Sequence, residues 1–313
     1  MPKLYLRPRG NLGNQMLQLI FAISLQEKVP DLQILGYDMP VWGLSAPAQM
    51  GWRLLTPSLR HRQTDGIGVA ELFRSGTLKR AKLQDVPLRC TNFAPAARFQ
   101  DLFPLPSAAR PVTRDDELLI HVRGGDILAA NNPDYGPMPI VWYRQLIEKT
   151  GLSPVFMGQV GADYYSDLLR TSFPTARFLE EQGVMADFAA IRQARHIAIS
   201  VSTFAWLGAW LSSAQSIHVP MFGIFNPLQR PDIWMLPDTD PRYTFYRFPE
   251  RKWSATPSQI AALSADWPIA VVSAQDIAAS ADQIAVTRQP MRAKALRSLR
   301  LRAKLSYLPQ IGS

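Results

Sequence analysis

The residues best suited to chemistry form the cluster His121-Val122-Arg123-Gly124-Gly125-Asp126. The apolar run Leu118–Val122 predicts a buried strand, so the cluster lies where that strand ends, the edge at which open α/β sheets bind ligands. The planar guanidinium of Arg123 suits phosphate oxygens, and the two glycines let backbone approach a ligand closely. Asp126 could orient that guanidinium or accept a proton. A purely structural ion pair between Arg123 and Asp126 is the alternative.

A second cluster, Arg9-Gly10-Asn11-Leu12-Gly13-Asn14-Gln15, separates a predicted strand at Lys3–Leu6 from a predicted helix at Met16–Leu25. A glycine turn that opens a helix can bind an anion on free backbone N–H groups. The simpler interpretation is a tight turn with Asn14 as the helix N-cap. The spacing matches neither the dinucleotide fingerprint nor the P-loop.

The third cluster runs from Ser200 to Leu211 and joins a predicted strand to an apolar helix. Ser202 and Thr203 are suited to cap that helix, whose first N–H groups could bind a pyrophosphate. Trp206 and Trp210 share a helix face, and core packing is their expected role.

From residue 117 onward, short strands alternate with helices, which predicts an α/β fold with parallel strands and helical crossovers. The predicted strands are Leu118–Val122, Val155–Met157, Arg177–Leu179, Ile197–Val201 and Ile217–Val219; the predicted helices are Pro139–Lys149, Tyr164–Arg170, Met185–Arg195 and Phe204–Ser212. Residues 40–114 give no clear pattern. We expect one domain at 1–110, a second at 111–270, and a linker with a basic helical tail at 271–313. The linker is expected because residues 268–280 are rich in Ala and Ser.

The three clusters together resemble the motifs of the α-1,2-fucosyltransferase family and its α-1,6 relatives, usually GGLGNQMFQ, HxRRxD and STFSWWAAWL. This chain has GNLGNQMLQ, HVRGGD and STFAWLGAWL in the same order. The resemblance implies a GT-B-like fold of two facing Rossmann-like domains, acceptor-side first and nucleotide-sugar-binding second. It also implies inverting transfer from GDP-fucose without a metal.

Carried over by position, the resemblance implies that Arg123 contacts the donor diphosphate, with His121 and Asp126 at the flanking positions of the motif. Gly124 and Gly125 are donor-binding candidates because they let backbone approach the ligand. Ser202 and Thr203 match hydroxyl groups near the nucleotide. The N-terminal loop matches through Gly10, Gly13, Asn14 and Gln15.

Gly124 departs from the family pattern, because the second arginine of HxRRxD is missing. One lost cation beside a leaving diphosphate could cost about 2–4 kcal/mol of transition-state stabilisation. Arg9 and Arg195 are candidates to compensate. Asp126 is the first candidate for the general base, with Asp134 and His121 behind it.

Charge and composition exclude some function classes. The net charge is +9, and seven cations with no acid lie between residue 283 and the end, which leaves about +2 for the rest. We therefore expect no nucleic-acid partner. The basic tail predicts either a helix packed on the body or contact with an anionic membrane, which would suit a lipid-linked acceptor. A single cysteine, Cys90, and the absence of a long apolar run favour a cytoplasmic protein. If the basic tail contacts lipid, the protein is peripheral at the inner face of the membrane.

No cofactor or metal is expected. Asp238-Thr239-Asp240 has the DxD form of metal-dependent glycosyltransferases, but it lies between Pro237 and Pro241 and is predicted to be a polar turn. The sequence thus favours a glycosyltransferase that uses a nucleotide sugar in surface polysaccharide or oligosaccharide synthesis. The alternatives are the same scaffold with another donor, and a catalytically silent glycan- or nucleotide-binding protein.

Overall fold

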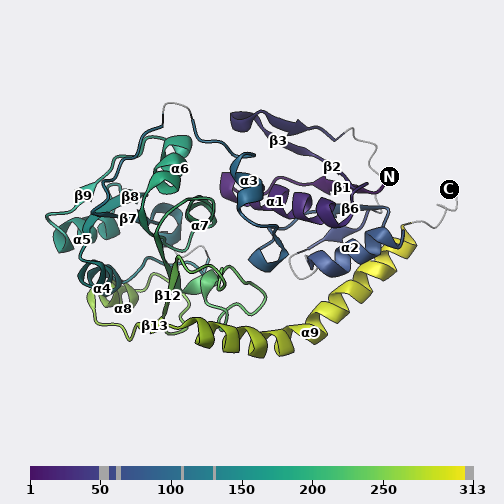
Figure 1. Cartoon of the computed structure of the whole chain (residues 1–313). Coiled ribbons are helices and arrows are strands. Elements are labelled where there is room, and N and C mark those ends of the chain that lie inside the picture. The colour runs from purple at the N-terminus through teal and green to yellow at the C-terminus, as the bar shows by residue number, and fades with distance from the viewer. Residues whose placement is uncertain (49–55, 61–64, 107–108, 130–131, 307–313) are drawn as a thin grey trace. The chain divides into compact units, whose positions relative to one another are not determined.

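The computed structural model describes residues 1–48, 56–60, 65–106, 109–129 and 132–306. The described part of the chain forms two compact units (Figure 1): unit 1 comprises Met1–Pro104 and Gln283–Ser313, and unit 2 comprises Leu105–Asp282. No described helix has both the length and the apolar character needed to cross a bilayer.

Unit 1 is built on a parallel sheet of β2 (Gln33–Leu35), β1 (Lys3–Leu6), β6 (Arg80–Leu83) and β5 (Ser58–Leu59), in that order. The helix α1 (Leu12–Lys28) buries nearly all of its apolar residues. The other elements of this unit are α2 (Gly66–Arg74), α3 (Ala97–Gln100), and the antiparallel pair β3 (Tyr37–Met39) and β4 (Leu44–Ala46). Sequence patterns did not resolve elements beyond residue 40 because these strands are too short to show a period.

Unit 2 contains a seven-stranded sheet in the order β13-β12-β11-β10-β7-β8-β9. Its strands are β7 (Glu117–Val122), β8 (Ser153–Gly158), β9 (Arg177–Phe178), β10 (His196–Ala198), β11 (Ser216–Met221), β12 (Tyr243–Arg247) and β13 (Ala270–Val272). All neighbouring pairs are parallel except β12 with β13. The helices are α4 (Ile140–Thr150), α5 (Tyr164–Ser172), α6 (Val184–Gln193), α7 (Thr203–Trp210) and α8 (Pro257–Ala261).

The predicted α/β class with parallel sheets is confirmed, and every strand and helix predicted between residues 117 and 221 is present. The prediction missed β12 and β13, because β12 follows a long proline-containing coil and β13 is an edge strand with two exposed residues. Residues 268–280 are therefore not a linker: they contain β13 and the start of α9 (Ala274–Leu305).

The basic tail is helical, as predicted, and its last turns pack against α2 of unit 1 (Figure 1). Arg292 donates two hydrogen bonds, of 2.7 and 2.6 Å, to the two oxygens of Asp65, which caps α2. Leu296 lies so close to Gly68 that an added Cβ there would stand 2.5 Å from its methyl group. Leu299 and Ala303 are fully buried. The part of the tail at 307–313 lies outside the described residues.

Replacing Leu299 by Ala should lower the free energy of unfolding by about 2–5 kcal/mol, because its side chain is fully buried. The matched control is Leu301→Ala in the same helix, where the side chain is 61% exposed. That control should change stability by no more than about 0.5 kcal/mol. Equal free energies of unfolding for the two variants in chemical denaturation would contradict the packing of α9.

Candidate functional site

The predicted cluster of unit 2 lies at the carboxyl edge of its sheet. Arg123 follows β7, Ser202 follows the neighbouring strand β10, and Gly158 ends β8 on the other side. A buried hydrogen bond of 2.8 Å between His121 Nδ1 and Ser200 Oγ ties the ends of β7 and β10 together. The strand order therefore brings the cluster at His121–Asp126 and the cluster at Ser200–Leu211 to one place, as parallel strands require.

Arg123 reaches outward from this edge. Its Nη2 donates a 2.6 Å hydrogen bond to Asp126, whose side chain is 63% exposed, whereas the arginine side chain is 23% exposed. The Nε of Arg123 is buried and has no hydrogen-bond partner among the described residues. An unsatisfied buried donor costs about 1–3 kcal/mol, so an oxygen that reached it would relieve that cost.

His121 is buried at the end of β7, next to this edge. Burial and the nearby charge of Arg123 lower its pKa to about 3, so the imidazole is neutral at pH 7. A buried neutral ring that is bonded to Ser200 is suited to holding two strands together. Its predicted contact with a nucleotide sugar stays a prediction.

The glycines of the cluster are explained by one neighbour, Gln159, which follows β8. A Cβ on Gly124 would lie 2.8 Å from the carbonyl oxygen of Gln159, and the Gly124 N–H donates to the Gln159 side-chain oxygen at 3.2 Å. Gly125 has a φ of +58°, and a Cβ there would lie 3.0 Å from the same amide. No arginine fits at position 124 while this chain segment keeps its place.

One of the two predicted substitutes for the missing cation, Arg195, does not stand beside Arg123. Arg195 precedes β10 and pairs with Asp115 at 2.5 Å, at the amino edge of the sheet, opposite to Arg123. Arg9 is in unit 1 and pairs with Asp85 at 3.0 Å. The prediction for Arg195 was wrong, because charge and position along the chain do not reveal its partner, and the prediction for Arg9 stays a prediction.

A cation that the sequence did not single out, Arg230, lies beside the cluster. It bonds Asp134 at 2.9 Å and Asp232 at 3.0 Å, and Gln229 donates to the other oxygen of Asp134 at 2.9 Å. Asp134 is thus an anchoring group, and its role as a general base stays a prediction. Arg230 lies in a coil, and only the fold brings it to Asp134.

Tyr135 is presented by the same anchored loop. Burial raises the pKa of its hydroxyl, while the charges of Arg123 and Arg230 act to lower it. The loop is fixed after it by Met138, whose carbonyl accepts a 2.7 Å hydrogen bond from the buried Tyr165. The hydroxyl of Tyr135 therefore lies at the carboxyl edge, within electrostatic range of both arginines. The spacing of the sequence motifs gave no sign of it.

The end of β10 leads into α7 through Ser202. Its hydroxyl accepts a 3.3 Å hydrogen bond from the N–H of Ala205, which confirms it as the helix cap, and Thr203 is the first helical residue. The N-terminus of α7 therefore lies at the carboxyl edge, where its dipole favours an anion. Trp206 and Trp210 stack at 5.4 Å in the core, as predicted.

In unit 1, the predicted N-terminal loop is a tight turn between β1 and α1. Gly10 has a φ of +70°, and its carbonyl accepts a 3.1 Å hydrogen bond from Gln15 Nε2. The N-cap of α1 is Asn11, so the prediction of Asn14 as the cap was wrong. Asn14 packs over Gly10, and Gly13 is buried in the first turn of the helix.

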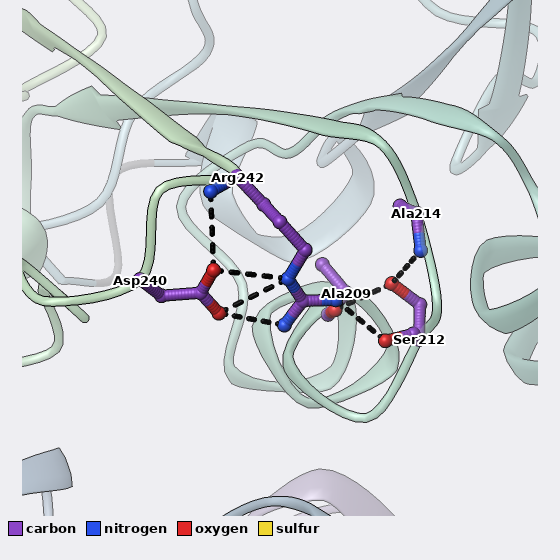
Figure 2. A network of polar contacts seen from close by, with 5 residues as sticks. All are labelled: Ala209, Ser212, Ala214, Asp240 and Arg242. Carbon is purple, nitrogen blue, oxygen red and sulfur yellow. Dashed lines mark hydrogen bonds and ion pairs between the residues drawn. The ribbon is translucent and has the colours of Figure 1, made fainter.

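The Asp-Thr-Asp segment is a turn, as predicted, and Figure 2 shows how its second carboxylate is held. Arg242 donates from Nε and Nη2 to Asp240, at 3.0 and 2.7 Å, and from Nη1 to the carbonyl of Ser212 at 2.6 Å (Figure 2). Burial raises the pKa of Asp240, but the hydrogen bonds from Arg242 outweigh it, so the pKa is lower than usual. This network precedes β12 and so lies at the amino edge of the sheet, opposite to Arg123.

Within the described ranges, no three His, Cys, Asp or Glu side chains are grouped as metal ligands would be. The absence of a metal from the reaction stays a prediction.

Comparisons with known proteins give only a remote likeness. No protein-family model matches the chain, and no curated protein matches it. The chain is similar to the dodecameric iron-containing heptosyltransferase TibC in complex with ADP-D-β-D-heptose, with 11% identity over 92% of this chain and 77% of that chain and a TM-score of 0.41.

A second TibC structure, from enterotoxigenic E. coli H10407, gives 11% identity over 91% and 76% of the two chains and a TM-score of 0.40. The E. coli heptosyltransferase WaaC with ADP gives 12% identity over 94% of this chain and all of that chain, with a TM-score of 0.37. A likeness this distant identifies neither a family nor a substrate for this chain.

Replacing Gly124 by Ala should lower the free energy of unfolding by about 1–3 kcal/mol, because the new Cβ meets a backbone carbonyl. Gly161→Ala is the matched control, since its Cβ would meet no atom closer than 4.0 Å. Equal stability of the two variants in urea denaturation would show that the Gln159 segment yields easily.

His121 makes stability dependent on acid. In the unfolded chain His121 is protonated below about pH 6.5, whereas in the folded protein it is protonated only below about pH 3. Between these pH values the unfolded state binds the extra proton, so the free energy of unfolding decreases as the pH falls. The slope is up to about 1.4 kcal/mol per pH unit. His121→Asn, which can still bond Ser200, should lose stability less steeply between pH 6.5 and 4 in denaturation experiments. Identical slopes would contradict a neutral His121.

Proposed function

We propose that this protein is an inverting, metal-independent glycosyltransferase that moves a sugar from a nucleotide-sugar donor, GDP-fucose in the first instance, to a hydroxyl of a glycan. The observation that carries the proposal is Arg123 at the carboxyl end of β7, with a buried Nε that lacks a partner and the capped N-terminus of α7 following the next strand. The motif resemblance supports the same assignment.

The leaving diphosphate sets the main chemical demand. Negative charge grows on its oxygens as the sugar–phosphate bond breaks, and donors already aimed at that charge lower the barrier. Arg123 offers a planar set of five N–H groups. The N-terminal dipole of α7 adds to the same field.

The acceptor hydroxyl must lose a proton during transfer. Asp126 is our candidate for the base because its carboxylate is 63% exposed at the sheet edge. Its ion pair with Arg123 would be exchanged, since phosphate oxygens compete for the same guanidinium. The exchange would free the carboxylate when the donor is bound.

On the same proposal, unit 1 supplies the acceptor side through the turn around Gly10, Gly13, Asn14 and Gln15. The positive φ of Gly10 and its bond to Gln15 give this turn a defined shape.

The donor is open to one structural alternative. Where the family pattern has a second arginine, this chain has Gly124 under the neutral amide of Gln159, and the nearby Arg230 is already paired with two carboxylates. The edge therefore offers less positive charge than two free arginines would. A nucleotide sugar other than GDP-fucose is the second candidate donor.

Arg123→Ala should weaken binding of the effective nucleotide and slow sugar transfer by about 10²–10³-fold. The fold should survive, because Asp126 is left exposed to water. Arg195→Ala is the matched control, an ion-paired arginine at the opposite edge of the same sheet. Titration calorimetry and transfer assays measure both variants, and full activity of Arg123→Ala would refute the proposal.

A thermal-shift panel of GDP-, UDP-, CMP- and dTDP-sugars identifies the donor. Stabilisation by another nucleotide and none by GDP species would replace GDP-fucose and keep glycosyl transfer. Donor hydrolysis without acceptor separates an enzyme from a silent binding protein, because a protein that only binds leaves the donor intact.

A further inference from the structure

The last turns of α9 have two distinct faces. The inner face is fixed to unit 1 by the paired hydrogen bonds of Arg292 with Asp65 and by the burial of Leu299 and Ala303. A helix held in this way has a defined outer face, because its rotation about its own axis is set by the buried side.

That outer face carries four cations. All of them are exposed and fall on the side opposite Leu299: Lys294, Arg297, Arg300 and Lys304. Residues spaced by three and four lie along one stripe of a helix. At a rise of about 1.5 Å per residue, the stripe is about 15 Å long.

Two leucines share this face with the cations. Leu301 is 61% exposed and Leu305 is 49% exposed. The two other leucines of the segment, Leu296 and Leu299, point inward instead. The outer stripe is therefore cationic with an apolar component.

The charge of the stripe is not neutralised locally. The sequence from Gln283 to the end contains no Asp or Glu. Within the part of the chain that the structure describes, none of the four outer cations has an ion-pair partner, whereas Arg292 on the inner face does.

We propose that the outer face of α9, formed by Lys294, Arg297, Arg300, Leu301, Lys304 and Leu305, docks on an anionic lipid bilayer. Charge complementarity carries the choice of partner, because a surface of anionic headgroups attracts clustered Lys and Arg. The two leucines favour a bilayer over a nucleic acid, since they can enter the acyl boundary and find nothing comparable on a phosphate backbone. Packing on the body and membrane contact thus belong to opposite faces of one helix.

The surface is independent of the proposed glycosyl transfer and would serve any reaction on a membrane-bound acceptor. It is formed entirely by residues that belong to unit 1.

The test is flotation of the full chain with vesicles of phosphatidylcholine alone, or of phosphatidylcholine mixed with phosphatidylglycerol. The protein should float with the vesicles that contain phosphatidylglycerol and not with those of pure phosphatidylcholine. The fraction that floats should decrease in high salt, because salt screens the charges. The variant K294E/R297E/R300E/K304E should bind on the order of 100-fold more weakly or worse. L301S/L305S should bind more weakly at every salt concentration.

The matched control is K28E/R110E/R144E/K252E, which changes the net charge equally at four exposed sites outside α9 and outside α2, the helix on which α9 packs. It should float like the unmodified protein, and unchanged thermal unfolding should show that all variants fold. Undiminished flotation of the α9 charge variant, or equal loss in the control, would overturn the proposal. The proposal would also be overturned if the protein bound duplex DNA or RNA as tightly as it binds the anionic vesicles and if L301S/L305S left that nucleic-acid binding unchanged. None of these readouts depends on a sugar donor, so transfer and docking can fail separately.

Discussion

The edge of the unit 2 sheet depends on the hydrogen bond between His121 and Ser200, because it ties the ends of β7 and β10 where no water can replace it. Burial keeps the imidazole of this bond neutral, because it lowers the pKa of His121 to about 3. Arg123 comes two residues after His121, and Ser202 comes two residues after Ser200. Their common position therefore follows from strand pairing and from one buried polar contact.

The second constraint on the edge is the close approach of the Gln159 segment, which leaves room only for glycine after Arg123. The chain therefore has one arginine at this point, with neutral amide and phenol groups around it. The second arginine, Arg230, holds the loop of Asp134 in place. The charge available to an anion is thus set by packing as much as by residue type, and this bears most directly on donor choice.

The helix α9 shows how one basic segment can be both structural and exposed. Its inner cation, Arg292, is neutralised by a carboxylate that also caps α2, so it contributes to the fold of unit 1. Its outer cations contribute little to folding, because exposed charges interact weakly in water. Composition alone counts both kinds equally, and only the orientation of the helix separates them.

The sequence by itself determined the class of fold, most elements of unit 2, the capping role of Ser202 and the turn at Asp240, because apolar periods and cap residues act over a few neighbours. It also located Arg123 at a strand end. Tertiary structure alone decided which charges are available: Arg195, Arg9 and Asp134 are paired, and Arg230 stands beside the cluster. Ion pairs between residues far apart in the chain depend on the path of the backbone in space, and no local pattern encodes that path.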